Sequence, residues 1–389
     1  MFDFDKVTDR RNTNSLKYDF SAQRGIPDDV LPLWVADMDF PSAPSVIQAL
    51  EQAVTHGIFG YSQGGQGYFT PLLAWYRSRF GWEPRPEWLV NTPGVVFAVC
   101  MAIRAFTEPG DAVLIQRPVY YPFSSSIEDN DRCLINSPLT YTGGRYEMDL
   151  EDFERKIVDE QVKLFILCSP HNPVGRVWRE EELLAVGEIC RRHGVLVLAD
   201  EIHADFVFAP NRHHIFAGLR PEFEDFTITC TAPSKTFNLA GLQISNIFIP
   251  NEQLRQHFCR EIAKTGYDEP SRMGLIASAA AYAGGGEWFD ALLGYLEGNR
   301  DYVRSELARR IPEIRLVEPE GTYLLWLDCR ALGFDERGLT DFIVNRAKLW
   351  LDEGTLFGPE GSGFERVNIA CPRATLAQAL DRLERACRG

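Results

Sequence analysis

Short apolar runs, separated by stretches with helical periodicity, dominate the middle of this sequence and restrict the folds that it can adopt. Five runs read as buried strands: Ala112–Gln116, Leu164–Cys168, Val195–Ala199, Phe226–Cys230 and Ile244–Ile249. Between the second and third runs, the segment Arg179–His193 carries apolar residues at helical spacing, and Gly194 follows as a stop signal. This alternation predicts an α/β fold, with a mostly parallel sheet covered by helices on both faces.

The C-terminal third follows a different pattern. Three glycines at 284–286 interrupt the alternation, and a long helical stretch follows from Trp288 to Arg310. A strand is predicted at Tyr323–Leu327, followed by two further helical stretches. We therefore predict a large α/β domain at residues 46–286. Residues 1–45 and 287–389 are predicted to form a smaller α+β domain that includes the N-terminal segment.

Composition and charge exclude several classes of protein. The chain of 389 residues has 40 Lys and Arg against 55 Asp and Glu, whereas nucleic-acid surfaces show a basic excess. No apolar run is long enough to cross a bilayer, and the N-terminus lacks the apolar core of a signal peptide. The nine cysteines include no CxxC pair, which favours free thiols in the cytoplasm and no metal site. We expect a small-molecule substrate and neither nucleic-acid nor membrane partners.

The segment TCTAPSKTFNLAGLQ at 229–243 contains the most informative lysine. It follows a predicted strand, so Lys235 lies just beyond a strand's carboxyl end, where open α/β sheets bind their ligands. A partly desolvated amine has a lowered pKa and is a better nucleophile toward an aldehyde. The neighbouring Ser234 offers a hydroxyl group to a phosphate. Because most lysines are surface charges, Lys235 indicates a functional site only in combination with the other candidate segments.

The strand VLVLADEIH at 195–203 ends in two adjacent carboxylates, of which one can face a crevice on a given side. A buried acid requires a cationic or hydrogen-bonding partner, and the protonated ring nitrogen of pyridoxal phosphate is such a partner. Capping of the next helix is the alternative for Asp200. Together with Lys235, the pattern favours the cofactor role. His203 is either a hydrogen-bond partner that orients Asp200 or a packing residue.

Two further segments place polar groups beyond predicted strands. SPHNPVG at 169–175 is a stiff turn whose Asn172 can bond a phenolic oxygen, although turn asparagines are common. TPGVVFAVCMAIRA at 92–105 opens a helix whose first N–H groups, including those of Val95 and Val96, can bind a phosphate.

Aromatic residues occur in two other candidate segments. RPVYYPF at 117–123 offers two rings, of which we assign Tyr120 to stacking on a cofactor ring and Tyr121 to the substrate side; core or rim packing is the alternative for both. GYSQGGQG at 60–67 lacks the Walker lysine, so Tyr61 either donates its hydroxyl to a phosphate or belongs to a flexible hairpin.

These segments occur in an order that resembles a known family. They read WVADMDFP, GYSQGGQGYFTPLLAWY, TPGVVFA, RPVYYPF, SPHNPVGRVW, LADEIHADF, TAPSKTFNLAGLQ and NIACPR. They are similar to the MalY/PatB-type cysteine-S-conjugate β-lyases, also called cystathionine β-lyase-like C–S lyases, of the fold type I aminotransferase superfamily. The match extends from Trp34 to Arg373. SPHNPVG is shared with many aminotransferases, whereas WVADMDFP and PSKTFNLAGL are typical of the lyase branch.

The resemblance implies a role for each candidate residue. Lys235 would form a Schiff base with pyridoxal 5'-phosphate and move protons at the substrate α-carbon. Asp200 would pair with the ring nitrogen, Asn172 with the phenolate oxygen, and Tyr120 would stack on the ring. The remaining assignments are the phosphate contacts Val95, Val96 and Ser234, Tyr61 reaching the phosphate from the other subunit of a homodimer, and Arg373 clamping the substrate carboxylate.

One position departs from the wider aminotransferase pattern. The eighth residue after the lysine is Gln243, where many aminotransferases carry a phosphate-binding arginine. The lyase branch shares this feature, and the phosphate would then rely on a helix dipole and hydroxyl groups.

The family implies a pyridoxal-phosphate-dependent carbon–sulfur lyase. Such an enzyme cleaves cystathionine, cysteine or related conjugates to pyruvate, ammonia and a thiol. Two alternatives remain at this point. The first alternative to the lyase is an aminotransferase for an aromatic or hydrophobic amino acid. The second is a regulatory or partner-binding protein that keeps the same fold.

Overall fold

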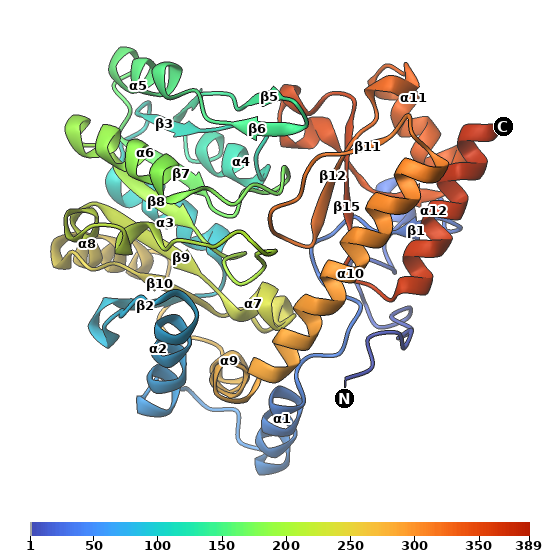
Figure 1. Cartoon of the computed structure of the whole chain (residues 1–389). Coiled ribbons are helices and arrows are strands. Elements are labelled where there is room, and N and C mark those ends of the chain that lie inside the picture. Colours follow the sequence, from blue (N-terminus) through green and yellow to red (C-terminus); the bar gives the residue numbers. More distant parts are fainter. Residues whose placement is uncertain (1) are drawn as a thin grey trace.

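The computed structural model describes residues 2–389 (Figure 1). Its central sheet contains seven strands: β2 (Leu89–Thr92), β3 (Ala112–Ile115), β4 (Cys133–Asn136), β7 (Leu164–Cys168), β8 (Leu196–Asp200), β9 (Thr227–Thr231) and β10 (Ser245–Phe248). The spatial order is β2-β10-β9-β8-β7-β3-β4. The five strands from β9 to β4 run parallel, β10 is antiparallel to both of its neighbours β9 and β2, and β2 therefore runs in the same direction as the five. This topology confirms the predicted mostly parallel sheet.

Helices cover both faces of the central sheet, as the alternation of the sequence predicts. The helices are α3 (Val95–Phe106), α4 (Pro122–Glu128) and α8 (Glu252–Ala263) on one face, and α5 (Leu150–Asp159) and α6 (Glu180–His193) on the other. Successive residues of β3 point to opposite faces of the sheet. Val113 and Ile115 pack in the core with α3, α4 and α8, whereas Leu114 packs in the core with α5 and α6. Helix α6 ends at Gly194, whose φ of 66° is a left-handed conformation that favours glycine.

Three further helices lie at the β2 edge of the sheet, where Figure 1 draws them at the bottom. They are α1 (Pro44–His56), α2 (Gln66–Phe80) and α9 (Arg272–Gly284). Both α1 and α2 pack against α9. The long helix α10 (Gly286–Arg310) begins next to α9 and extends to the other end of the molecule (Figure 1).

A second, antiparallel sheet lies at that end, which confirms the α+β character expected there. Its order is β11-β12-β15-β14, and α10 packs against α12 beside it. Its elements are β11 (Arg315–Leu316), β12 (Leu324–Asp328), β14 (Asp352–Glu353), β15 (Phe364–Asn368), α11 (Glu336–Asp341) and α12 (Arg373–Arg388). Two smaller pairings complete the chain: β5 (Thr140–Thr142) with β6 (Arg145–Glu147), and β1 (Leu31–Pro32) with β13 (Leu349–Trp350).

The N-terminal segment 33–40 crosses between the two sheets and is held by side chains from both sides. From β15, Asn368 donates through Nδ2 to the carbonyl oxygens of Val35 and Asp37 at 2.7 and 2.6 Å. From the loop after β9, Asn238 donates to two further carbonyl oxygens of the segment, each at 3.0 Å. Because buried carbonyl groups require donors, these amides fix the path of the segment.

The cysteines of residues 2–389 are all free thiols. Five of them are buried, namely Cys168, Cys190, Cys230, Cys329 and Cys371. In the same range, none of the helices combines the length and apolar character that a bilayer crossing requires.

Candidate active site

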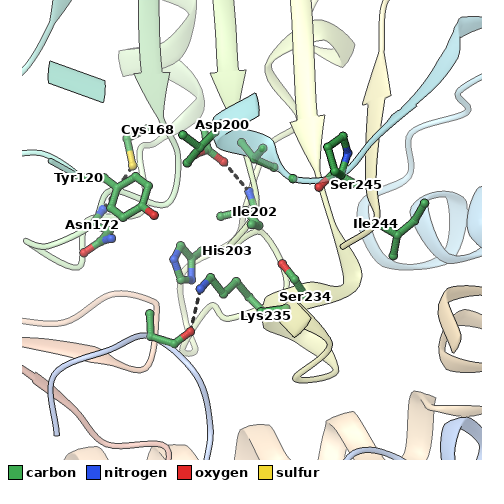
Figure 2. A pocket seen from close by; sticks show the side chains of 16 residues that line it. Tyr120, Cys168, Asn172, Asp200, Ile202, His203, Ser234, Lys235, Ile244 and Ser245 are labelled. Atoms are coloured by element: carbon green, nitrogen blue, oxygen red, sulfur yellow. Dashed lines mark hydrogen bonds between the residues drawn. The ribbon is translucent and has the colours of Figure 1, made fainter. Parts of the chain in front are cut away.

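The carboxyl ends of β7, β8 and β9 meet at a cavity of about 190 Å³ (Figure 2). Open α/β sheets bind ligands at this position. The cavity is lined by Ala36, Pro93, Gly94, Val95, Val96, Tyr120, Cys168, Asn172, Asp200, Ile202, His203, Ser234, Lys235, Ala240, Ile244 and Ser245. It therefore brings together eight residues that the sequence singled out, from five separate segments: Val95, Val96, Tyr120, Asn172, Asp200, His203, Ser234 and Lys235.

The three most informative residues each follow a parallel strand. Asn172 lies in the turn after β7, Asp200 is the last residue of β8, and Lys235 lies in the short helix α7 (Pro233–Thr236) after β9. Pro233 occupies the first position of α7, where its missing N–H costs nothing and its fixed φ starts the helix. Adjacent strands thus deliver an amide, a carboxyl group and an amine to one space.

The side chain of Lys235 is partly buried, and its amine is bound to the N-terminal segment. Its Nζ donates to the carbonyl oxygen of Ala36 at 2.7 Å, a contact that Figure 2 marks with a dashed line. Burial lowers the pKa of Lys235 to about 8, and the positive charge of Arg366 acts in the same direction. A substantial fraction of the amine is therefore neutral near pH 8 and can act as a nucleophile or a base.

The carboxyl group of Asp200 is also buried. One hydrogen bond reaches it within residues 2–389, from the backbone N–H of Ile202 to Oδ1 at 3.1 Å. Burial raises the pKa of Asp200 to about 7; that bond and the charge of Lys235 offset part of the effect. A cationic N–H donor in the cavity would stabilise the ionised form of this group.

Arg366 is the functional candidate that sequence reasoning missed. It lies in β15 and is 3% exposed. Its Nη1 donates to Oδ1 of Asn172 at 2.9 Å, and its Nη2 donates to the carbonyl oxygen of Trp34 at 3.1 Å and forms an ion pair with Asp352. Because the amide oxygen of Asn172 accepts a hydrogen bond from Arg366, the NH₂ group of Asn172 is left to donate elsewhere.

A signal for Arg366 is present in the sequence. Phe364, Arg366 and Asn368 alternate in the strand FERVN, so all three side chains share one face of β15. Both polar residues of that face reach other parts of the site, since Arg366 contacts Asn172 and Asn368 contacts segment 33–40.

The amino end of α3 forms another part of the cavity wall. The helix begins at Val95 without a side-chain cap, so its first backbone N–H groups are available to an anion. Val95 and Val96 both line the cavity, together with Ser234 and Ser245. Free N–H groups, a helix dipole and serine hydroxyls are the features that bind phosphate groups in proteins.

The three candidate tyrosines differ in their surroundings. Tyr120 lines the cavity beside Cys168 and Asn172 (Figure 2). Tyr121 is 40% exposed and lines a second cavity instead. Tyr61 is 92% exposed and does not line the first cavity of its own chain.

The structure places Arg373 outside the cavity. This residue opens α12, and the first turn of α12 faces α10 rather than the cavity. Its Nε donates to Oδ1 of Asn299 at 2.7 Å, and its guanidinium lies 4.8 Å from the ring centre of Tyr302. Arg373 therefore connects two helices and lies outside the cavity, whereas Arg366 bonds a cavity residue directly.

For His203, the structure favours the packing role over the orienting role. The ring is buried and lines the cavity, but no hydrogen bond of the described chain joins it to Asp200. Its Nδ1 has no partner within residues 2–389, and the ring packs edge-on against Tyr323 at 5.8 Å. Burial lowers the pKa of His203 well below its ordinary value, so the ring is neutral at physiological pH.

The raised pKa of Asp200 predicts a stabilising substitution in the ligand-free protein. The pKa in the folded state, about 7, exceeds the ordinary value of 3.8, so the folded state binds the proton more tightly than the unfolded state. The stability that this provides is present at acidic pH and is lost as pH rises toward 7. Asp200→Asn, which keeps the acceptor for Ile202, should therefore be more stable than the wild type at pH 8, by on the order of 4 kcal/mol at most.

Denaturant unfolding at pH 5 and pH 8, without added ligand, measures this difference. The advantage of Asp200→Asn should shrink at pH 5. A variant less stable than the wild type at pH 8 would contradict the assigned desolvation.

Comparisons with known proteins agree with this geometry. The model of the "Aminotransferase class I and II" family matches residues 28–383. Cystathionine beta-lyase PatB of Bacillus subtilis is 42% identical over 98% of this chain and 99% of its own, and Protein MalY of Escherichia coli is 35% identical over 100% and 99%. The crystal structure of cystalysin from Treponema denticola, which contains a pyridoxal 5'-phosphate cofactor, superposes with a TM-score of 0.97 at 37% identity, covering 100% of this chain and 99% of that one. The resemblance read from the sequence is thereby confirmed, and the chain belongs to the class I and II aminotransferase family.

Proposed function

We propose that this protein is a pyridoxal-phosphate-dependent carbon–sulfur β-lyase. It cleaves cystathionine, cysteine or related cysteine conjugates to pyruvate, ammonia and a thiol. The observation that carries the proposal is the pairing of a desolvated amine, Lys235, with a desolvated carboxyl group, Asp200, in one cavity. Full-length similarity to PatB, which is named a cystathionine beta-lyase, supports the lyase reaction.

The buried polar groups fit this cofactor. Within residues 2–389, Asp200 has no cationic hydrogen-bond donor, and a protonated pyridine nitrogen would provide one. The NH₂ group of Asn172 is free to donate to a phenolate oxygen because Arg366 occupies its other end. The first N–H groups of α3 and the hydroxyl of Ser234 suit the phosphate, and the ring of Tyr120 forms a wall of the cavity.

The cofactor supplies an electron-withdrawing pyridinium ring, which stabilises negative charge at the substrate α-carbon. Arg366 binds the substrate carboxylate, since a guanidinium pairs with carboxylates through two parallel hydrogen bonds. That contact orients the α-carbon toward Lys235. With a pKa near 8, the neutral amine of Lys235 is a base of suitable strength for the α-proton.

The reaction breaks two bonds of the substrate. The α-carbon–hydrogen bond breaks as the proton moves to Nζ of Lys235. The β-carbon–sulfur bond breaks as sulfur leaves with the electron pair as a thiolate, which is then protonated. One water molecule converts the remaining three-carbon fragment to pyruvate and ammonia, so no oxidant or reductant is required.

The position of Tyr61 supports a dimeric site. Its side chain is 92% exposed and outside the cavity of its own chain, as expected if it serves the phosphate of a second subunit. We therefore propose a homodimer with residues of both subunits at each site. We also propose the division into a cofactor-binding domain of residues 46–286 and a second domain of residues 1–45 and 287–389, and a cytoplasmic location, in keeping with nine free thiols.

Product analysis separates a lyase from an aminotransferase, which would use the same residues. With added pyridoxal phosphate and L-cystathionine, the purified protein should release pyruvate and thiol in equal amounts without any added 2-oxo acid. Aromatic amino acids with a 2-oxo acid serve as the comparison. Amino transfer to the 2-oxo acid, without pyruvate and thiol from cystathionine, would establish the aminotransferase instead.

A matched pair of arginine variants tests the substrate carboxylate site. Arg366→Met should lower kcat/KM for L-cystathionine by about 10²-fold or more, because a buried charged hydrogen-bond partner is lost. Arg373→Met removes the same charge from the contact with α10 and should leave kcat/KM within about twofold. Steady-state pyruvate formation measures both variants. The reverse ranking would return the carboxylate role to Arg373.

A further inference from the structure

A second cavity, of about 350 Å³, is lined by Asp352, the ion-pair partner of Arg366. Arg366 bonds Asn172 of the first cavity and Asp352 of the second, and the adjacent residues Tyr120 and Tyr121 line one cavity each. The second cavity is lined by Arg24, Ile26, Trp34, Tyr121, Thr340, Ile343, Val344, Trp350, Leu351, Asp352, Glu353, Leu356 and Glu365. Two contacts of Arg366, the carboxylate of Asp352 and the carbonyl oxygen of Trp34, therefore belong to residues that line this space.

Two carboxyl groups in the second cavity have no cationic partner among residues 2–389. Glu353 and Glu365 are directly opposite each other on β14 and β15. Within residues 2–389, neither side chain forms an ion pair or accepts a hydrogen bond, and the Oε2 of Glu365 is buried without a partner. Glu365 is 1% exposed. Like charges directly across a strand pair destabilise a sheet, so this arrangement favours a cation between them.

The pKa of Glu365 responds to the same neighbouring negative charges. Burial, followed by the negative charges of Glu353 and Asp352, raises the pKa of Glu365 well above its ordinary value. Asp352 differs from the other two acids because Arg366 neutralises it. A cationic ligand would allow Glu365 to ionise and would replace the missing partner.

The walls of the cavity favour an organic cation over a metal ion. The rings of Trp34 and Trp350 stack 4.5 Å apart, and Tyr121 lines the same space. Aromatic faces attract ammonium groups. In the described part of the chain, no group of three or more ligating side chains is arranged to hold a metal ion.

A basic side chain stands beside the aromatic wall. The guanidinium of Arg24 lies 5.0 Å from the ring centre of Trp34, and Arg24 forms no ion pair within residues 2–389. A guanidinium and carboxyl groups that line one cavity, each without an ion pair within residues 2–389, suit a ligand that carries both charges.

We propose that the second cavity binds the far end of the substrate's sulfur substituent and selects conjugates in which that end carries an ammonium group. This inference rests on the proposed lyase function. Glu353 and Glu365 accept the N–H bonds of the ammonium group. Arg24 pairs with a carboxylate on the same carbon where the substituent has one, as the homocysteine half of cystathionine does.

A pair of substrates that differ at one atom tests the proposal. S-(3-aminopropyl)-L-cysteine and S-butyl-L-cysteine have substituents of equal length, and one ends in an ammonium group where the other ends in a methyl group. The wild type should show a higher kcat/KM for the aminopropyl compound. The ratio of kcat/KM for the aminopropyl compound to kcat/KM for the butyl compound is then compared between variants. This comparison cancels the difference between the two leaving thiols.

Glu353→Gln and Glu365→Gln should each lower the aminopropyl-to-butyl ratio by about tenfold or more, since a charged hydrogen-bond acceptor is lost. Glu336→Gln, an exposed acid on α11, is the matched control and should leave the ratio unchanged. Arg24→Met should lower the ratio of cystathionine to the aminopropyl compound. Glu353 lies at the end of the edge strand β14 and is partly exposed, so Glu353→Gln decides the question even if Glu365→Gln fails to fold.

Two outcomes would overturn the proposal. One is a wild type that prefers the butyl compound, and the other is a ratio that Glu353→Gln leaves unaltered. Failure of the lyase function itself has a different signature, because neither compound would then yield pyruvate with the wild type.

Discussion

Lys235 and Asp200 line one cavity, and Arg366 bonds Asn172 of the same cavity; Asp200 and Arg366 are buried, and Lys235 is partly buried. Burial disfavours the charged forms of the amine and of the carboxyl group. It lowers the pKa of Lys235 to about 8 and raises the pKa of Asp200 to about 7. A fold selected for stability alone would fill this space with apolar side chains. The arrangement is suited to a ligand that brings an aldehyde to the amine and a cation to the carboxyl group.

Segment 33–40 makes this arrangement depend on both sheets. The carbonyl oxygen of Ala36 accepts hydrogen bonds from Lys235 at 2.7 Å and from the hydroxyl of Tyr323 at 3.0 Å, so the central sheet and the antiparallel sheet both supply donors to one atom. Arg366 and Asn368 of β15 hold other carbonyl groups of the segment. A relative movement of the sheets would therefore change the contacts of the Lys235 amine directly.

Local sequence patterns predicted the central sheet and the residues that follow its parallel strands. Asn172, Asp200 and Lys235 were found because the carboxyl end of a buried strand is a position that periodicity identifies. Sequence patterns did not predict the contacts between distant segments. Arg373 follows an apolar stretch and a proline, but only the packing of α12 on α10 directs it away from the cavity, and only the β15 register directs Arg366 toward it. The opposed carboxyl groups of Glu353 and Glu365 likewise depend on a strand pairing that periodicity does not specify.

The central claim is that the amine of Lys235 holds the aldehyde of pyridoxal phosphate. Borohydride reduction of the purified protein with the cofactor, followed by proteolysis and mass spectrometry, tests it most directly. The account predicts a single modified peptide, with the reduced cofactor attached to Lys235. Attachment to another lysine, or no attachment after complete loading, would contradict it.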